Sequence, residues 1–443
     1  MKKSWKIFVT SALLAGSSVA IALPFNSFDP RSMAMGGAGV AVGDAKIAPF
    51  FNPALLTVTR EEDDFSLAFP IIGVRAYDPE KFATSLDDFQ KKDSVGTLQT
   101  SIDSYNNAMG STLTDVSTNT ATLSSEFTTL SDKPIQAEMG AGMVIGIPSK
   151  TFGGAFYATG WGAVGGVIKY RDSQTLADVT YAMDAVAACQ ATPTPACATA
   201  ISTDPRITPY YDTGTNTVTF NTNNLQSSVD IRGVVLSEAG FAMSHEFNFM
   251  GSDFGVGITP KVVRAMLLDY SADVNSSSTG NATDSDYTAK YTSANFDLGL
   301  AKDYANGWRT GFVIKNVIPH SYDFKRIATG AASGSPQITT GSIKMKAQAR
   351  IGVSHSNSWS TAALDVDLTA NDPAGFENKS QYVALGGELN AWDWAQLRAG
   401  YRADLKNSNR SVASVGVGLG PFDLAVSGNA NEVGASASFG FTF

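Results

Sequence analysis

The most constraining feature of this chain is a two-residue rhythm in its last eleven residues. From Val433 to Phe443, apolar side chains occupy every odd position, and small or polar residues occupy every even position. Successive side chains of a β-strand point to opposite faces, so the segment predicts a strand with one apolar and one hydrophilic face. Such a strand fits a barrel wall between lipid and a hydrated lumen. A strand of a soluble β-sandwich alternates in the same way, so other segments must separate the two folds.

Two further segments, residues 343–353 and 394–404, repeat the rhythm and place charges on the hydrophilic face. Charges in a row are costly inside a soluble core, whereas a water-filled lumen hydrates them. We therefore expect an all-β fold, a transmembrane antiparallel β-barrel. The predicted lumen charges include acidic residues of neighbouring strands. They are Lys344, Lys346, Arg350, Asp365, Asp367, Glu388, Arg398 and Arg402.

The number of strands follows from the segments that share this pattern. Fourteen candidates cover residues 65–78, 136–148, 152–171, 231–248, 253–270, 291–303, 308–318, 343–355, 359–369, 380–390, 394–404, 411–419, 421–430 and 432–443. The connections between them are alternately long and short, as expected if long loops lie outside the cell and short turns face the periplasm. After the amino terminus the chain has no run of about 18 apolar residues, so a barrel is the structure with which it would cross a membrane.

The first residues resemble an export signal. Three lysines, Lys2, Lys3 and Lys6, precede an apolar stretch, and Ala20-Ile21-Ala22 has the small-x-small pattern that signal peptidase cleaves. Residues 1–22 are therefore predicted to be a signal peptide, which places the mature protein beyond the inner membrane. We expect the outer membrane of a Gram-negative bacterium, with membrane lipids around a monomeric barrel at residues 61–443.

Composition agrees with a barrel and excludes some functions. Charged residues make up 16% of the chain, 41 residues are glycine, and the mean hydropathy is -0.03. Lipid-facing and lumen-facing residues that alternate average to such a value. The net charge of -9 argues against nucleic acid as a partner, because binding to phosphates requires basic patches.

Cysteines and histidines give no indication of catalysis. Cys189 and Cys197 are predicted to form a loop disulfide, since an exported chain meets an oxidising compartment. A redox pair is the weaker alternative, because a thioredoxin-like motif has only two residues between its cysteines. His245, His320 and His355 fall on a strand, an outer loop and a turn, so we expect no enzyme activity, no metal site and no cofactor.

Two long connections are expected at the outer side of the barrel. In residues 79–135, apolar residues recur at steps of three and four, which predicts amphipathic helices over the barrel mouth. These helices either cap the barrel or offer an apolar landing surface to a ligand. Residues 172–230 contain the cysteine pair and are rich in Thr, Ser, Asn and Asp, so we expect a mobile loop there.

Before the first strand lies a glycine-rich segment, residues 23–60, that is too long for a simple tail. Gly36, Gly37 and Gly39 allow close backbone approach and positive φ. A phosphate loop is excluded because no Gly-Lys-Ser/Thr follows. We expect a compact plug inside the lumen.

Here the sequence resembles a known family. The run Arg31-Ser32-Met33-Ala34-Met35-Gly36-Gly37-Ala38-Gly39-Val40-Ala41, followed by Phe51-Asn52-Pro53-Ala54-Leu55, resembles the amino-terminal hatch of the long-chain fatty-acid transporters, the FadL-type outer-membrane barrels. The stretches Gln381-Tyr382-Val383-Ala384-Leu385-Gly386-Gly387-Glu388-Leu389, Trp392-Asp393-Trp394 and Leu397-Arg398-Ala399-Gly400-Tyr401-Arg402 are similar to a branch labelled conjugal-transfer TraF-like. The final aromatic-x-aromatic also resembles the signal that such barrels present to their insertion machinery.

The resemblance implies a fourteen-stranded barrel with an internal plug, helical outer loops that receive a hydrophobic ligand, and a kinked third strand that opens a lateral route. The glycine-rich third strand candidate, residues 152–171, fits a bulge. The residues implied to form the plug and ligand region are Gly36, Gly37, Gly39, Asn52, Pro53 and Ala54.

Two functions follow from these expectations. The first is passive uptake of hydrophobic molecules such as long-chain fatty acids, in which a carboxylate ligand pairs with lumen cations. The same cations would instead serve a lumen salt-bridge ladder with Asp365, Asp367 and Glu388. The second function is a structural or assembly role in a conjugal transfer or secretion system, without transport.

Overall fold

The computed structural model describes residues 28–57, 64–273, 284–328, 331–371, 376, 379–392 and 394–443. The predicted signal peptide and both ends of the 23–60 segment lie outside the described residues.

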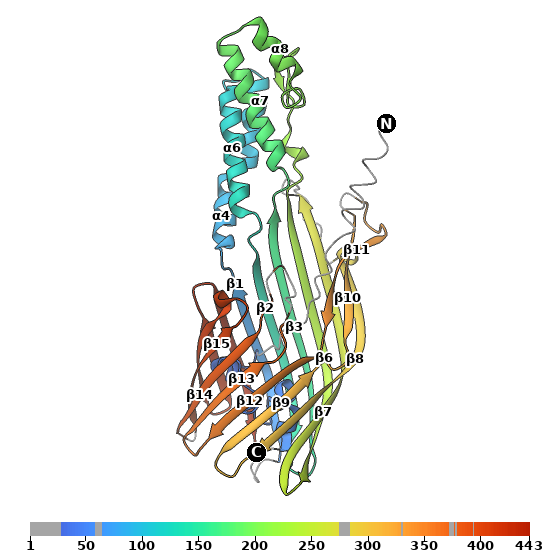
Figure 1. The fold of residues 1–443 in the computed structure, drawn as a ribbon, viewed down its shortest axis with the longest axis vertical. Helices are drawn as coiled ribbons and strands as arrows, with labels where there is room; N and C mark the ends of the chain where they lie inside the picture. The colour runs from blue at the N-terminus through green and yellow to red at the C-terminus, as the bar shows by residue number, and fades with distance from the viewer. Residues whose placement is uncertain are drawn as a thin grey trace.

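Fourteen antiparallel strands close into a barrel, one for each candidate of the sequence (Figure 1). The wall consists of β1 (Ser66–Tyr77), β2 (Ile135–Ile147), β3 (Gly153–Lys169), β6 (Ser228–Phe249), β7 (Ser252–Asp273), β8 (Thr288–Asp303), β9 (Trp308–Lys315), β12 (Gln348–Ser356), β13 (Ser360–Asp367), β14 (Tyr382–Trp392), β15 (Ala395–Asp404), β16 (Val412–Leu419), β17 (Phe422–Gly428) and β18 (Glu432–Thr442). The first strand pairs with the last, so the predicted transmembrane barrel is confirmed.

Alternation along the strands separates a lipid face from a lumen face. In β17, Phe422, Leu424 and Val426 are 49–56% exposed on the outside, whereas the intervening residues Asp423, Ala425 and Ser427 are at most 8% exposed. This is the opposite of a soluble protein, in which the apolar face is the buried one. None of the helices in the described residues has both the length and the hydropathy that crossing a membrane requires.

The two ends of the barrel differ. One end, called the turn end here, has tight turns with positive-φ glycines at Gly251, Gly307 and Gly420. The other, the helical end, carries all the long connections (Figure 1). The longest wall strands are β6 and β7, with 22 residues each, and the shortest is β17, with 7.

The two long connections fold together into a helical domain. It contains α4 (Phe82–Lys92), α5 (Ser94–Asn106), α6 (Leu113–Leu130), α7 (Ser173–Ala191), α8 (Pro195–Thr203), η2 (Thr222–Asn224) and the small hairpin of β4 (Tyr211–Asp212) and β5 (Thr217–Val218). Leu98 and Phe127 from the first connection pack with Leu176 and Met183 from the second in one fully buried core. A disulfide joins Cys189 to Cys197.

The structure of this domain differs from what the sequence predicted for the outer loops. Residues 172–230 do not form a structureless loop, because α7 buries its apolar side against α5 and α6. Most apolar residues of 79–135 are buried in that core, so they offer no landing surface to a ligand. The helices also project beyond the end of the barrel and do not lie across its mouth (Figure 1).

A hairpin between β9 and β12 was not predicted. It consists of β10 (His320–Ile327) and β11 (Gln337–Met345), which pair only with each other. The predicted strand at 343–355 is therefore wrong in its first residues, since 343–345 belong to β11 and the wall strand starts at Gln348. The chain leaves the sheet between the two strands, yet the alternation of residue types continues across the break.

The kink implied for the third strand is also absent. β3 pairs with β6 over its whole length, and with β2 from Gly154 to Gly166, without a register shift. One register shift lies instead between β14 and β15, and another lies in β1, where one extra residue is accommodated between Ala68 and Ile71 on both sides of the strand. Pro70 lies at this position and has no N–H group to donate to a ladder.

Candidate functional site

The amino-terminal segment, residues 28–57, lies inside the barrel. It forms α2 (Pro30–Ala34), α3 (Ala48–Phe51) and η1 (Pro53–Thr57), and every residue from 29 to 57 is buried except Arg31, Asp44 and Lys46, which are partly exposed. α2 packs against β15 to β18, while η1 packs against β3 and β6 to β8. The segment therefore reaches from one side of the lumen to the opposite side.

Glycines on the inner face of the wall make room for this segment. A Cβ atom at Gly400 would overlap the backbone of Met35 and Gly36, and one at Gly257 would overlap the backbone of Pro53 and Ala54. Backbone overlaps also occur at Gly311 and Gly386, whereas a Cβ atom at Gly299 or Gly416 would overlap the side chain of Asn52 or Ala34. Wall strands around the barrel thus supply a ring of glycines against which the segment packs closely.

Charged wall residues bind the glycine run of the segment. Asp365 accepts hydrogen bonds from the backbone N–H groups of Gly39 at 2.8 Å and Val40 at 2.9 Å. Arg350 donates to the carbonyl of Gly37 at 3.1 Å and pairs with Asp367 at 2.6 Å. Two of the predicted lumen charges, Asp365 and Arg350, therefore meet the predicted plug glycines, and a third, Asp367, pairs with Arg350.

The Asn-Pro-Ala tripeptide is held on the opposite side. The Asn52 amide donates to the carbonyls of Val40 at 3.0 Å and Leu300 at 2.9 Å, and its oxygen accepts from the Ala54 N–H at 3.1 Å. Asn52 is fully buried, and both ends of its amide are satisfied. The side chain thus fastens the segment to itself and to β8.

A second set of predicted charges binds α2. The guanidinium of Arg31 donates two hydrogen bonds of 3.0 Å to Glu388, and Arg398 pairs with the same carboxylate at 2.7 Å and with Asp423. Bidentate pairs of this kind are among the strong charge-assisted hydrogen bonds. Glu388 and Arg398 therefore anchor the segment as well as each other.

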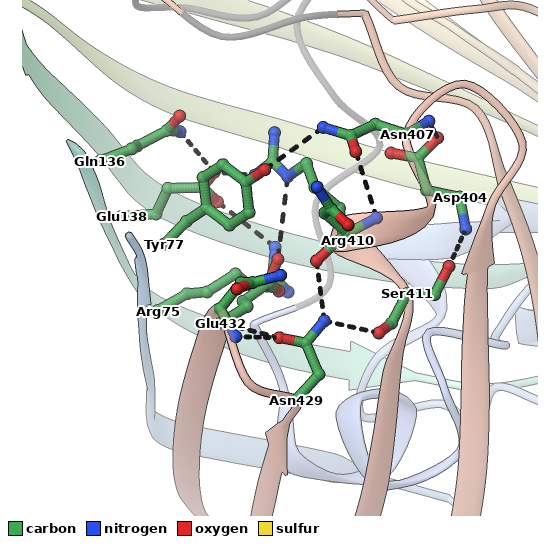
Figure 2. Close-up of polar contacts among 12 residues, drawn as sticks. Arg75, Tyr77, Gln136, Glu138, Asp404, Asn407, Arg410, Ser411, Asn429 and Glu432 are labelled. Atoms are coloured by element: carbon green, nitrogen blue, oxygen red, sulfur yellow. Dashed lines mark hydrogen bonds and ion pairs between the residues drawn. The ribbon is translucent and has the colours of Figure 1, made fainter. Parts of the chain in front are cut away.

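A third cluster lies where β1 meets β18, towards the helical end (Figure 2). Glu432 forms an ion pair with Arg75 at 3.2 Å, accepts a hydrogen bond from Arg402, and lies 3.7 Å from Arg410. Glu138 pairs with Arg75 at 3.4 Å and with Arg410 at 3.5 Å. Only Arg402 of this cluster was singled out in the sequence, because the strands that close a barrel are far apart along the chain.

Two predicted lumen cations lie elsewhere. Lys344 is half-buried on β11 and Lys346 is exposed just after it, so neither belongs to the wall strand that contains Arg350. That both line the lumen stays a prediction. The side-chain parity reverses where the chain leaves β11, which buries Ile343 and Met345 instead. Arg350, Arg398 and Arg402 are each paired with a carboxylate, which is the salt-bridge arrangement considered above.

The helical half of the lumen has an unusual apolar inner face. Wall residues there that point inward form a buried cluster, called the apolar wall here: Trp161, Ala163, Val234, Leu236, Val263, Ala265 and Leu267. The β10–β11 hairpin covers this wall with Tyr322, Phe324, Ile343 and Met345. Lumen faces of such barrels are ordinarily polar, so this apolar surface needs an explanation.

Cavities remain on either side of the segment. At the turn end a cavity of about 1450 Å³ is lined mainly by polar and charged residues, including Asp44, Lys46 and Arg309. A cavity of about 60 Å³, called the lumen cavity here, lies between the segment and the apolar wall, with Phe28, Phe50 and Trp161 in its lining. At the helical end, a third cavity of about 410 Å³ includes Tyr77 and Lys169.

The three histidines have separate neighbours. His245 contacts Phe247, His320 contacts Tyr322, and His355 contacts Trp308. Within the part of the chain that the structure describes, no three His, Cys, Asp or Glu side chains are grouped as metal ligands would be.

These features define a transmembrane β-barrel whose lumen is occupied by its own amino-terminal segment. Residues 49–367 match the family model described as "F plasmid transfer operon, TraF, protein". The chain belongs to this family. No curated protein matches the sequence.

Solved structures of similar proteins have low sequence identity. The toluene transporter TbuX of Ralstonia pickettii is 13% identical, with a TM-score of 0.48, over 95% of this chain and 99% of that one. The monoaromatic hydrocarbon channel CymD is 11% identical, with a TM-score of 0.48, over 97% and 99%. The toluene transporter TodX of P. putida is 11% identical, with a TM-score of 0.45, over 95% and 99%.

Proposed function

We propose that the protein is an outer-membrane channel for the passive uptake of hydrophobic molecules. The observation that carries this proposal is the apolar wall on the inner faces of β3, β6 and β7. An apolar surface that faces water costs roughly 25 cal/mol for each Å². A channel for ions or sugars has no use for such a wall, whereas a hydrophobic molecule that enters the lumen gains by binding it.

The β10–β11 hairpin has to move before a hydrophobic molecule can bind the apolar wall. Tyr322 and Phe324 of the hairpin pack against the apolar wall, where a bound hydrophobic molecule would otherwise lie. A molecule entering from the helical end replaces these contacts with its own, so the apolar wall stays out of water when the hairpin is displaced. Uptake then proceeds down a concentration gradient without an energy source.

The lumen charges argue against a carboxylate as the recognised group. Arg350, Arg398 and Arg402 already have buried carboxylate partners, so a fatty-acid anion would have to compete with them. The proposal therefore concerns hydrophobic molecules as a class, of which long-chain fatty acids are not the favoured member.

The experiment is uptake of a radiolabelled hydrocarbon into liposomes that contain the purified protein. We expect uptake to fall severalfold in the wall variant Ala265→Asn, because the added amide is unsatisfied against a bound hydrocarbon. Ala198→Asn on the exposed face of α8 is the matched control. Equal uptake by protein-free liposomes and by liposomes with the wild-type protein contradicts the proposal.

A second candidate function rests on the helical domain. Its core is built from two connections far apart in sequence and extends beyond the barrel, which suits a contact surface for other proteins of a transfer or secretion system. Removing residues 79–131 and 172–226 together should abolish such contacts in cross-linking experiments while hydrocarbon uptake persists. Retained partners after this deletion contradict the assembly role.

A further inference from the structure

The lumen cavity combines aromatic walls with a buried amide. Phe50 meets Tyr157 edge-on at 5.8 Å between ring centroids, and Phe28 lies 5.6 Å from Phe50. Asn316 lines the same cavity and is 6% exposed. Its Oδ1 is buried and has no hydrogen-bond partner among the described residues. A buried amide oxygen in this state costs about 1–3 kcal/mol, so a bound hydrogen-bond donor would stabilise it.

The backbone holds this amide in place. Asn316 has a φ of 55°, in the left-handed region that Asn tolerates better than most residues. Its N–H donates to Asp297 at 2.7 Å, which is itself bound to Lys261 at 3.0 Å. The backbone of Asn316 is thus held by the charged network of Asp297 and Lys261, and not by contacts of the Asn316 side chain.

The charges around the cavity are balanced. Lys261 pairs with Glu238 at 3.1 Å as well as with Asp297, and Lys315 donates to the carbonyl of Phe50 at 2.9 Å. Two lysines therefore accompany two carboxylates. An additional buried charge on a ligand would be uncompensated, and the cost of burying it is several kcal/mol. The cavity favours a neutral polar group over an anion or a cation.

The cavity has room for a head group and not for a whole hydrophobic molecule. One water needs about 10–15 Å³ of such volume, so about 60 Å³ accommodates roughly four or five water-sized atoms. Trp161 and Leu236 line the cavity and also belong to the apolar wall. A chain attached to the head group would therefore pass directly onto the wall that the hairpin covers.

We propose that the ligand is a neutral amphiphile whose hydroxyl or amide group binds Asn316 in the lumen cavity while its apolar chain lies along the apolar wall. The proposal rests on the proposed uptake function and names its substrate class. A hydroxyl both donates and accepts, so it satisfies the Asn316 amide in either orientation.

The test is equilibrium binding of three radiolabelled probes to the full-length protein in phosphatidylcholine nanodiscs, with empty nanodiscs as the partition control. The probes are 1-octanol, octane and octanoate. We expect 1-octanol to bind about tenfold more tightly than octane, the gain from one hydrogen bond that satisfies a buried acceptor. Octanoate should bind more weakly than 1-octanol. Equal affinity for 1-octanol and octane overturns the proposal and leaves the uptake function standing, because octane still binds.

A matched pair of variants locates the head group. Asn316→Gly keeps the positive φ and removes the amide, so its affinity for 1-octanol should fall about tenfold, to that for octane. Asn216→Gly makes the same change at a φ of 54° in the helical domain and should leave binding unchanged. An unchanged affinity in folded Asn316→Gly protein shows that the cavity holds water alone and overturns the proposal. The comparison of probes on the wild-type protein needs no variant, and binding of no probe above empty nanodiscs contradicts the uptake function itself.

Discussion

Substituting Glu432 tests whether ion pairs across the closing seam hold the barrel together. The Glu432 side chain has no exposed surface and is shared by Arg75 of β1, Arg402 of β15 and Arg410. Glu432→Gln removes the carboxylate that these three guanidinium groups share, while Glu138 still pairs with Arg75 and Arg410. Removing one partner of a buried ion pair costs about 3–5 kcal/mol, because the remaining charges stay buried without compensation.

The assay is equilibrium unfolding of the barrel by urea in detergent micelles, followed by heat-modified mobility on gels. With a urea dependence of about 3 kcal/mol/M, this loss moves the midpoint down by about 1–2 M. Asp303→Asn is the matched control, since Asp303 pairs with Arg309 at 2.5 Å but is 54% exposed. Exposed pairs contribute about 0–1 kcal/mol, so its midpoint should hardly change. Equal midpoints for the two variants would refute the argument that the seam depends on Glu432.

Four further outcomes follow from particular contacts. Gly400→Val overlaps the backbone of the amino-terminal segment and should open the lumen to ions in planar-bilayer recordings, whereas Gly160→Val, where a Cβ meets no atom within 4 Å, should not; closed channels in both would contradict the glycine ring. Cys197→Ser removes a short disulfide loop worth about 2–3 kcal/mol, so α8 should become sensitive to protease while the barrel resists it, and an intact α8 would speak against this. Hydrogen bonds from the Thr112 backbone and then its side chain lower the pKa of Asp115, so the amide-exchange protection of the amino-terminal turn of α6, relative to the intrinsic exchange rate at each pH, should fall as pH falls through that lowered value. The Asp115→Asn protein should lose this pH dependence, and its persistence would assign it to another group. Amide exchange should also be faster in β10 and β11 than in residues 29–57, and the reverse order would mean that the segment is the mobile part.

The sequence predicted the strands of the barrel wall better than the contacts of the segments inside the barrel. Alternation identifies the fourteen strands because each side of the wall has its own solvent, and this signal is local. The contacts of Gly257 and Gly400 could not be predicted, since their partners in the amino-terminal segment are more than a hundred residues away. The same holds for Glu432 and Arg75, which meet only when the barrel closes. The β10–β11 hairpin was missed for another reason, because alternation does not reveal where a chain leaves one sheet for another.

The amino-terminal segment and the hairpin both occupy the lumen, but different forces hold them. The segment lies on glycine backbone and is fastened by buried charges, including Arg31 to Glu388 and Asp365 to the N–H groups of Gly39 and Val40. If the segment moved away, the buried Asp365 would lose these two N–H donors and Glu388 would keep only one of its two arginine partners, Arg398, which is costly for buried charges. The hairpin is held mainly by apolar contact, with hydrogen bonds such as that between Tyr322 and Ser293 at 2.6 Å. A hydrophobic ligand reproduces apolar contact and does not reproduce ion pairs. In the proposed uptake, displacement by such a ligand would therefore act on the hairpin, with the segment as the fixed floor of the proposed binding site and the hairpin as its movable cover.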